Sequence, residues 1–278
     1  MGNITRRQHY IPQMILRNFC FDNNTCWEYS LNTKTFEQKK IESLFYQNFL
    51  YEIKKDDGSF YNPNGVNSAE QGFCQIEGKY AEFFRELFSE LDHNDSVFID
   101  KENRELICFW IALIIHRNPM IKKLLPENAE QFGYSIRDRL NIDYNFLGLM
   151  TKSVEYHVGD LIKGQMTFLR AHISEGFVIS DFPIVFYNDV LHNYCYAPIS
   201  SEYAVLIQEP ENALKNLDKC QIIDLSLVDT VKKNKEIYEC LKSAKISDIE
   251  FGNSIIAKKE SILRHVVMPG YDIFLHKK

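Results

Sequence analysis

The chain has 278 residues, of which 45% are hydrophobic and 25% are charged, so it can bury a large core and is not disordered as a whole. Its net charge of −6 provides no overall positive field for nucleic acid, so such a partner would need a local basic patch. Residues 1–20 offer one, because Arg6, Arg7 and Arg17 occur there without an acidic residue.

The first elements expected along the chain are a short helix and a hairpin. Pro12 and the apolar residues after it predict a helix over 11–17, since proline fits the first helical turn. Residues 26–31 and 36–41 flank a short polar turn, which predicts a β-hairpin. Residues 54–67 concentrate turn formers and charges, so we expect an exposed loop there.

Helices are expected throughout the middle of the chain. Ser68 begins a capping-box arrangement, and the apolar spacing after it predicts a helix over 68–91. The segment 101–116 is apolar almost all round in its second half, so it should be the central buried helix. Two further helices are expected over 126–140 and 144–165.

Short strand-like runs replace the helices after residue 166. They are expected at 168–173, 177–179, 184–187, 203–207 and 221–225. Helices follow near 226–243 and 248–265. Because strands and helices do not alternate regularly, we predict an α+β fold with an N-terminal hairpin, a central buried helical bundle and C-terminal antiparallel strands with helices. No linker is evident, so a single domain over 1–278 is expected.

The cysteines and apolar segments indicate a cytoplasmic protein. Seven cysteines form no CxxC pair and are odd in number, which argues against a disulfide framework or a zinc ribbon. Cys74 and Cys108 fall on apolar faces of the expected helices, where a thiol is usually inert. Residues 1–20 lack the apolar core of a secretory signal, and the apolar run 106–115 is far shorter than the roughly 20 residues that span a bilayer. We therefore expect no membrane partner.

A series of motifs resembles a known family. The opening motif is His9-Tyr10-x-Pro12-Gln13-x-x-Leu16-Arg17-x-Phe19, and later landmarks are Phe45-Tyr46, Glu70, Glu77, Arg117-Asn118-Pro119 and Ser180-Asp181-Phe182-Pro183. Over roughly residues 8–207 the chain resembles the domain-of-unknown-function family 4238. It departs from the family pattern at His116, where a glutamine is usual, and at 198–201, where Pro-Ile-Ser-Ser replaces Pro-Leu-Ser-Pro.

The resemblance marks positions without naming their chemistry, because the family has no assigned activity. Its members are common in bacteria, and some look associated with defence or toxins. Our first hypothesis is a nuclease or nucleotide-processing phosphodiesterase of that type, because a histidine, two arginines and several carboxylates coincide with the family's positions. Nucleic acid or a nucleotide would be its partner, and a divalent cation is its candidate cofactor. The candidate catalytic residues are His9, Glu77 and Asp181, and the candidate substrate-binding residues are Arg17, Arg117, Glu70 and His116.

The spacing of these residues supports the hypothesis. Glu70 and Glu77 lie seven apart beside an apolar helical stripe, so both carboxylates should point toward the core and need a cation or several donors. Asp181 interrupts two strand-like runs, where ligand-binding groups are common. His116 and Arg117 end a very apolar helix, which would deliver them to one edge of a cleft.

A rival hypothesis uses the same charges structurally. Each glutamate would pair with an arginine, and the chain would be a non-enzymatic sensor or regulatory binding module whose ion pairs hold the N-terminal segment on the helices. Under it Arg17 is the favoured buried partner of Glu70 or Glu77. Separately, the helical spacing of His157 with Val154 and Leu161 predicts a core histidine. Phosphate-binding loops of the GxxxxGK[ST] type and GxSxG elbows are missing from the sequence, which disfavours nucleotide-driven motors and ordinary serine hydrolases. The sequence leaves the oligomeric state open.

Overall fold

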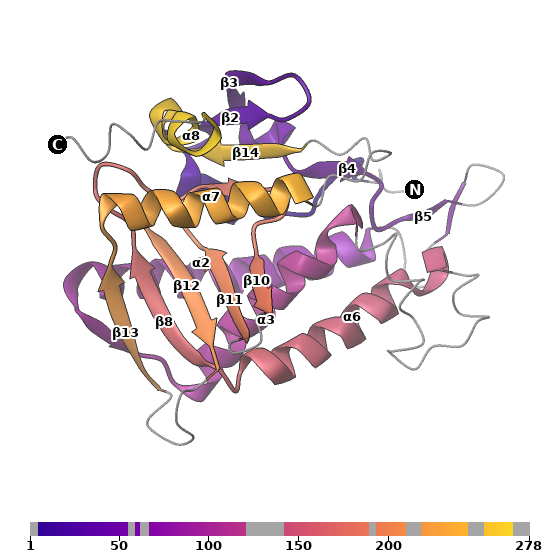
Figure 1. Cartoon of the computed structure of the whole chain (residues 1–278). Coiled ribbons are helices and arrows are strands. Elements are labelled where there is room, and N and C mark those ends of the chain that lie inside the picture. Colours follow the sequence, from indigo (N-terminus) through magenta and orange to yellow (C-terminus); the bar gives the residue numbers. More distant parts are fainter. Residues whose placement is uncertain are drawn as a thin grey trace.

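The computed structural model describes residues 5–54, 59–61, 67–120, 142–188, 193–209, 218–243 and 253–268. Two main sheets and a group of long helices make up this part of the chain (Figure 1). Helices and strands are both abundant without regular alternation, so the prediction of an α+β fold is confirmed.

The larger sheet contains six strands in the order β10-β11-β12-β8-β13-β7. Their bounds are Ser96–Phe98 for β7, Gln165–Arg170 for β8, Val185–Asn188 for β10, Asn193–Pro198 for β11, Tyr203–Gln208 for β12 and Lys219–Asp224 for β13. Neighbouring strands are antiparallel except β8 and β13, which run parallel. The prediction of C-terminal antiparallel strands is therefore wrong for this pair.

The smaller sheet has the order β3-β2-β14-β9 and joins both ends of the chain. Its strands β2 (Thr25–Ser30) and β3 (Thr35–Lys40) are the predicted hairpin, and β9 (Ile179–Ser180) was also expected. Strand β14 (Ser254–Ala257) falls inside the helix expected over 248–265, so that prediction is wrong there. All four β14 side chains are buried between β2 and β9, which favours an extended strand, and helix α8 begins only at Glu260 and ends at Val267.

Two small ribbons and a short helix complete the N-terminal part. Strand β1 (Arg7–His9) pairs with β4 (Tyr46–Asn48), and β5 (Ile53–Lys54) pairs with β6 (Phe60–Tyr61). Part of the expected loop 54–67 is thus a ribbon, while 55–58 and 62–66 lie outside the described residues. The expected helix over 11–17 is α1 (Gln13–Leu16), which follows Pro12 and continues as the 3-10 turn η1 (Arg17–Phe19).

The long helices were largely predicted. They are α2 (Ser68–His93), α3 (Lys101–Arg117), α6 (Ile142–Leu161) and α7 (Leu227–Ser243), whereas the helix expected over 126–140 lies outside the described residues. The capping box at Ser68 is wrong, because α2 is preceded by Asn67 at φ 63° as its N-cap. By contrast, the Asp100 side chain caps α3 by accepting from the Asn103 backbone N–H at 2.8 Å.

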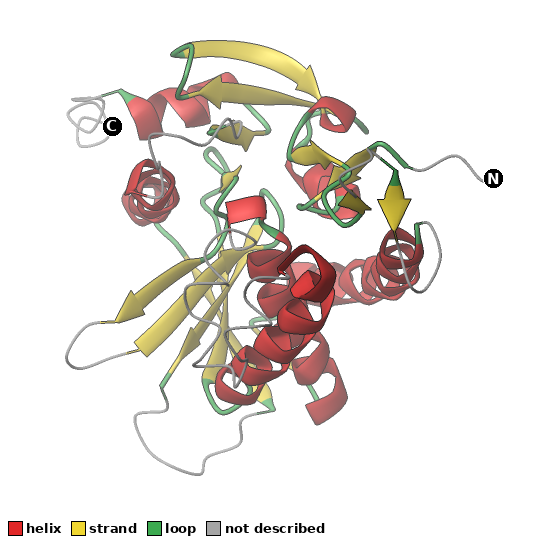
Figure 2. Ribbon diagram, turned by 90° about the vertical axis from the view of Figure 1, so that its right-hand side faces the viewer, coloured by secondary structure: helices red, strands yellow, loops and turns green. Residues whose placement is uncertain are grey.

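Aromatic contacts join the helices to one another and to the large sheet. The Phe84 ring of α2 meets Trp110 of α3 edge to face, with ring centroids 5.2 Å apart. Phe88, one turn further along α2, stacks on Tyr203 of β12 at 6.0 Å. Helices α2, α3 and α6 therefore form the predicted central bundle beside the sheet (Figure 2), while α7 lies between the two sheets.

The structure also tests the predictions about the cysteines and about membrane-spanning helices. The seven cysteines all lie within the described residues and form no disulfide there, and Cys108 is buried as expected. Cys74 is exposed, so its placement on an apolar face was wrong, because it lies on the outer side of α2. Among the helices of the described ranges, none combines the length and apolar character that a membrane span requires.

Candidate functional site

Arg117, the last residue of α3, is the centre of a polar network although only 1% of its surface is exposed. Its Nη1 donates to Glu77 Oε1 at 2.6 Å, and its Nε donates to the Tyr51 hydroxyl at 2.9 Å. Its Nη2 donates to the backbone carbonyl of His9 at 2.6 Å. The guanidinium carbon lies 4.2 Å from the centroid of the Phe73 ring. We call these five residues the Arg117 network.

The network explains how a very apolar helix can end in a buried cation. Burial works against the charged form, but Tyr51 and Glu77 outweigh it and raise the pKa of Arg117 above its usual value. A planar guanidinium can lie on a ring face and still donate in its own plane, which a lysine could not do. Arg117 thus joins α2, α3 and strand β1. Tyr51 was not predicted, since it lies in an irregular segment without periodicity.

His9 contributes its backbone to the network and its ring to a separate contact. Its Nε2 lies 2.9 Å from the side-chain nitrogen of Gln13, one turn along the opening motif. Burial lowers the pKa of His9 to about 4, assisted by Arg117 and Arg7 and opposed by a backbone contact with Leu44. The imidazole is therefore neutral near pH 7, whereas an efficient general acid or base has a pKa near the working pH.

Asp181 lies in a second polar cluster that is also buried. Its Oδ1 accepts from the Tyr10 hydroxyl, and its Oδ2 accepts from the Ser254 backbone N–H at 2.5 Å. Its carbonyl accepts from Asn118 Nδ2 at 2.7 Å. Burial raises the pKa of Asp181 to about 6, although the bonds from Tyr10 and Ser254 oppose the rise.

The two clusters are connected through the backbone rather than through a shared cavity. Tyr10 follows His9, and Asn118 follows Arg117, so each cluster takes one member from each of the same two segments. Among the predicted residues, the structure brings His9, Glu77 and Arg117 together. Asp181 instead contacts Tyr10 and Asn118, the chain neighbours of His9 and Arg117. Both carboxylate oxygens of Asp181 already have donors within the protein.

Glu70 and Glu52 add two unsatisfied oxygens beside the Arg117 network. The Oε2 atoms of both residues are buried and have no hydrogen-bond partner in the described part of the chain. Burial raises the pKa of Glu70, with Arg117 opposing and Glu77 and Glu52 adding to the rise. Glu52 was missed by sequence reasoning because it lies outside any regular element. Within the described ranges, no three or more His, Cys, Asp or Glu side chains are placed to hold one metal ion.

The remaining predicted residues lie elsewhere. Arg17 is exposed, so the prediction that it is the buried partner of Glu70 or Glu77 is wrong; Arg117 takes that position at Glu77. His116 is buried rather than placed at a cleft edge, and its Nε2 lies 3.1 Å from Nδ1 of His157. Burial and then His157 lower the pKa of His116 to about 4. His157 is half-buried and paired, not an isolated core histidine.

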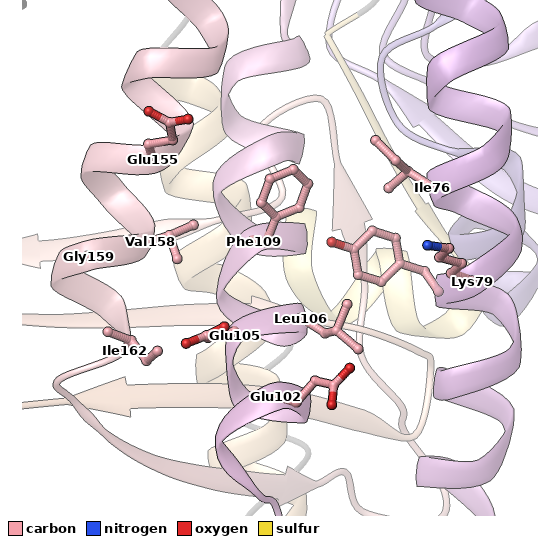
Figure 3. Close-up of a pocket in the computed structure, with 11 residues that line it drawn as sticks. Ile76, Lys79, Glu102, Glu105, Leu106, Phe109, Glu155, Val158, Gly159 and Ile162 are labelled. Carbon is pink, nitrogen blue, oxygen red and sulfur yellow. The ribbon is translucent and has the colours of Figure 1, made fainter.

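A cleft of about 610 Å³, lined by none of these residues, lies between α2, α3 and α6. Figure 3 shows Leu106 and Phe109 of α3 between Ile76 of α2 and Val158 of α6. We call it the three-helix cleft. Sequence reasoning missed it, because its lining residues follow ordinary helical spacing and only the separation of the helices creates the space.

The comparisons with known proteins agree with the motif resemblance. The model of the family described as "Protein of unknown function (DUF4238)" matches residues 7–259. The match extends further toward the C-terminus than the segment 8–207 on which the resemblance was recognised. No curated protein and no solved structure matches the chain.

Proposed function

Since the chain belongs to the DUF4238 family, whose description assigns no activity, we propose from its geometry that it is a non-enzymatic sensor or regulatory binding module. In this proposal the charged motif residues hold the fold together, and a ligand binds elsewhere. The observation that carries it is the commitment of Arg117: all three guanidinium nitrogens donate to protein acceptors, and the side chain is almost fully buried.

The acceptors of Arg117 show which segments of the chain its side chain connects. One is the His9 carbonyl, which belongs to β1, and the others lie on Glu77 of α2 and Tyr51 after β4. An isolated two-stranded ribbon is marginally stable in water, so β1 and β4 need such attachment to the helices. Tyr10 and Asp181 attach the next residue of the same segment to the smaller sheet.

A phosphodiester-cleaving enzyme draws less support from the same residues. A phosphate clamp needs guanidinium N–H groups directed at an accessible anion. Arg117 is buried, and the exposed Arg17 is not part of the Arg117 network. A general acid or base needs a proton to exchange near neutral pH, and His9 has a pKa of about 4. Nucleic acid, nucleotide and divalent-cation binding remain hypotheses for direct test.

The test is a hydrolysis assay on the purified full chain. RNA, single- and double-stranded DNA and nucleoside triphosphates are incubated with it in Mg²⁺, Mn²⁺ or Zn²⁺, beside His9→Ala and Glu77→Gln variants. We expect no turnover in any arm. Turnover by the wild-type chain would overturn the proposal, and loss of that turnover in a His9→Ala variant with an unchanged melting temperature would assign it to the motif residues.

A further inference from the structure

We propose that the three-helix cleft binds a small amphiphilic cation, meaning an apolar molecule that carries an ammonium group. This inference rests on the proposed function, because it names the ligand class of the binding module. Three observations support it: the size and apolar walls of the cleft, the stacked rings of Tyr80 and Phe109, and the charge of the rim.

The cleft has the dimensions of a small-molecule site. Its volume of about 610 Å³ falls within the range of roughly 300 to 1,000 Å³ typical of ligand pockets. Its walls are apolar side chains that remain partly exposed although they lie on central helices, among them Leu106, Phe109 and Val158. Apolar surface that the fold itself leaves uncovered can be buried by a ligand, which contributes about 25 cal/mol per Å².

Tyr80 supplies an aromatic ring and a hydroxyl to the lining of the cleft. The residue lines the cleft, and only 3% of its surface is exposed. The ring lies 6.4 Å from that of Phe109 in a stacked arrangement. A ligand ammonium could donate to the hydroxyl or lie against these rings, both of which attract cations.

The rim selects the sign of the ligand charge. Glu102, Glu105 and Glu155 line the cleft together with one cation, Lys79, which leaves an excess of two negative charges. Figure 3 shows the three carboxylates around the apolar walls on the α3 and α6 side. Lys101 approaches Glu105 to 3.8 Å, but both side chains are exposed, so this pair neutralises the rim only weakly. The cleft should therefore reject the phosphates of a nucleotide and attract an ammonium group.

The first experiment compares three probes that share a decyl chain and differ in the charge of the head group. Decylammonium, decanol and decyl sulfate are titrated below their micelle concentrations into the full chain and followed by isothermal titration calorimetry. We expect one-to-one binding of decylammonium at least about five-fold tighter than decyl sulfate at low salt. A triple variant, E102Q/E105Q/E155Q, should lose this preference and still bind decanol.

A matched pair of glycine variants tests whether decylammonium binds in the three-helix cleft. A Cβ at Gly159, which lines the cleft, would meet nothing within 4 Å, and the same holds for Gly78, which is exposed on α2 outside the cleft. Gly159→Leu should fill the cleft and weaken the binding of decylammonium at least about ten-fold. Gly78→Leu should leave that affinity unchanged. Both should fold, because replacing a helical glycine is favourable by roughly 0.5–1 kcal/mol for alanine.

Each outcome separates this inference from the proposed function. Binding that Gly159→Leu leaves unchanged, equal affinity for decyl sulfate, or ligand-induced pairing of two chains would overturn the inference. None of these results would affect the stability role of Arg117. Conversely, hydrolysis by the wild-type chain would overturn the proposed function while leaving a cleft measured by calorimetry in place.

Discussion

Replacement of Arg117 by methionine tests whether the motif arginine is a structural clamp. Removing one partner of a buried ion pair costs about 3–5 kcal/mol. Glu77 is 24% exposed and can partly hydrate, which reduces its share of that cost. The Tyr51 hydroxyl and His9 carbonyl also lose their donor, at about 1 kcal/mol each. We therefore expect Arg117→Met to lower the free energy of unfolding by about 4 kcal/mol.

The assay is thermal and urea unfolding of the full chain, followed by circular dichroism. For a chain of this size, about 4 kcal/mol corresponds to a fall in melting temperature of roughly 8–16 °C. Arg17→Met is the matched control, because Arg17 is also an arginine of the recognised motifs but is exposed, and its replacement should cost less than about 0.5 kcal/mol. Equal effects of the two variants would refute the assignment of Arg117 as the clamp.

A double-mutant cycle identifies the ion pair within that loss. Glu77→Gln keeps a side-chain oxygen that can accept from Arg117 but removes the charge, so it should destabilise less than Arg117→Met. In the combined variant the two losses should not add, and the coupling free energy should exceed about 1 kcal/mol. Additive losses would mean that Arg117 stabilises the fold through Tyr51, the His9 carbonyl and Phe73 alone.

Three further predictions concern other parts of the fold. Burial raises the pKa of Glu175 from 4.5 to about 7, and His265 opposes the rise. The free energy of unfolding of the wild type should therefore increase by up to about 3 kcal/mol relative to Glu175→Gln as the pH falls from about 7 to 4.5. Urea titrations at several pH values check this, and a constant difference between the two chains would contradict it. Tyr10→Phe removes a donor to ionised Asp181, so it should lower the free energy of unfolding by about 1–3 kcal/mol at pH 8. The loss should be smaller at pH 4, where the Asp181 carboxyl is protonated, and an equal loss at both pH values would contradict this prediction. Gly164→Ala would place a Cβ 2.4 Å from Ile207 Cγ2, so its melting temperature should fall, whereas Gly78→Ala should raise it; a rise in both would disprove the crowding at residue 164.

Local patterns in the sequence were sufficient for the elements whose partners are near in the chain. The hairpin of β2 and β3 follows from two runs around a polar turn, and α2 and α3 follow from apolar spacing. Strand β14 could not be found in this way, because it is extended only where β2 and β9 bury it on both sides. The parallel pairing of β8 with β13 likewise depends on contacts across the fold.

The candidate site shows the same limit for individual residues. Spacing correctly indicated that Glu77 faces a cation, since its carboxylate lies beside an apolar stripe. It could not tell Arg17 from Arg117 as that cation, because the choice depends on how α3 meets α2. It also could not show that the cleft exists, since helical periodicity describes one helix and the cleft depends on the distance between three.

The positions of the motif residues relative to the cleft have a consequence for specificity. His9, Tyr10, Glu77, Arg117 and Asp181 bind one another, or one another's backbone, where the N-terminal segment meets the helices and the smaller sheet. None of the residues that line the three-helix cleft belongs to the recognised motifs. If the module binds its ligand in that cleft, the motif preserves the attachment of the N-terminal segment, and the cleft walls are free to differ between relatives. Related chains that share the opening motif should then keep the Arg117 clamp and differ in the charge of the rim, so that a chain with a basic rim prefers decyl sulfate to decylammonium in the same calorimetric assay.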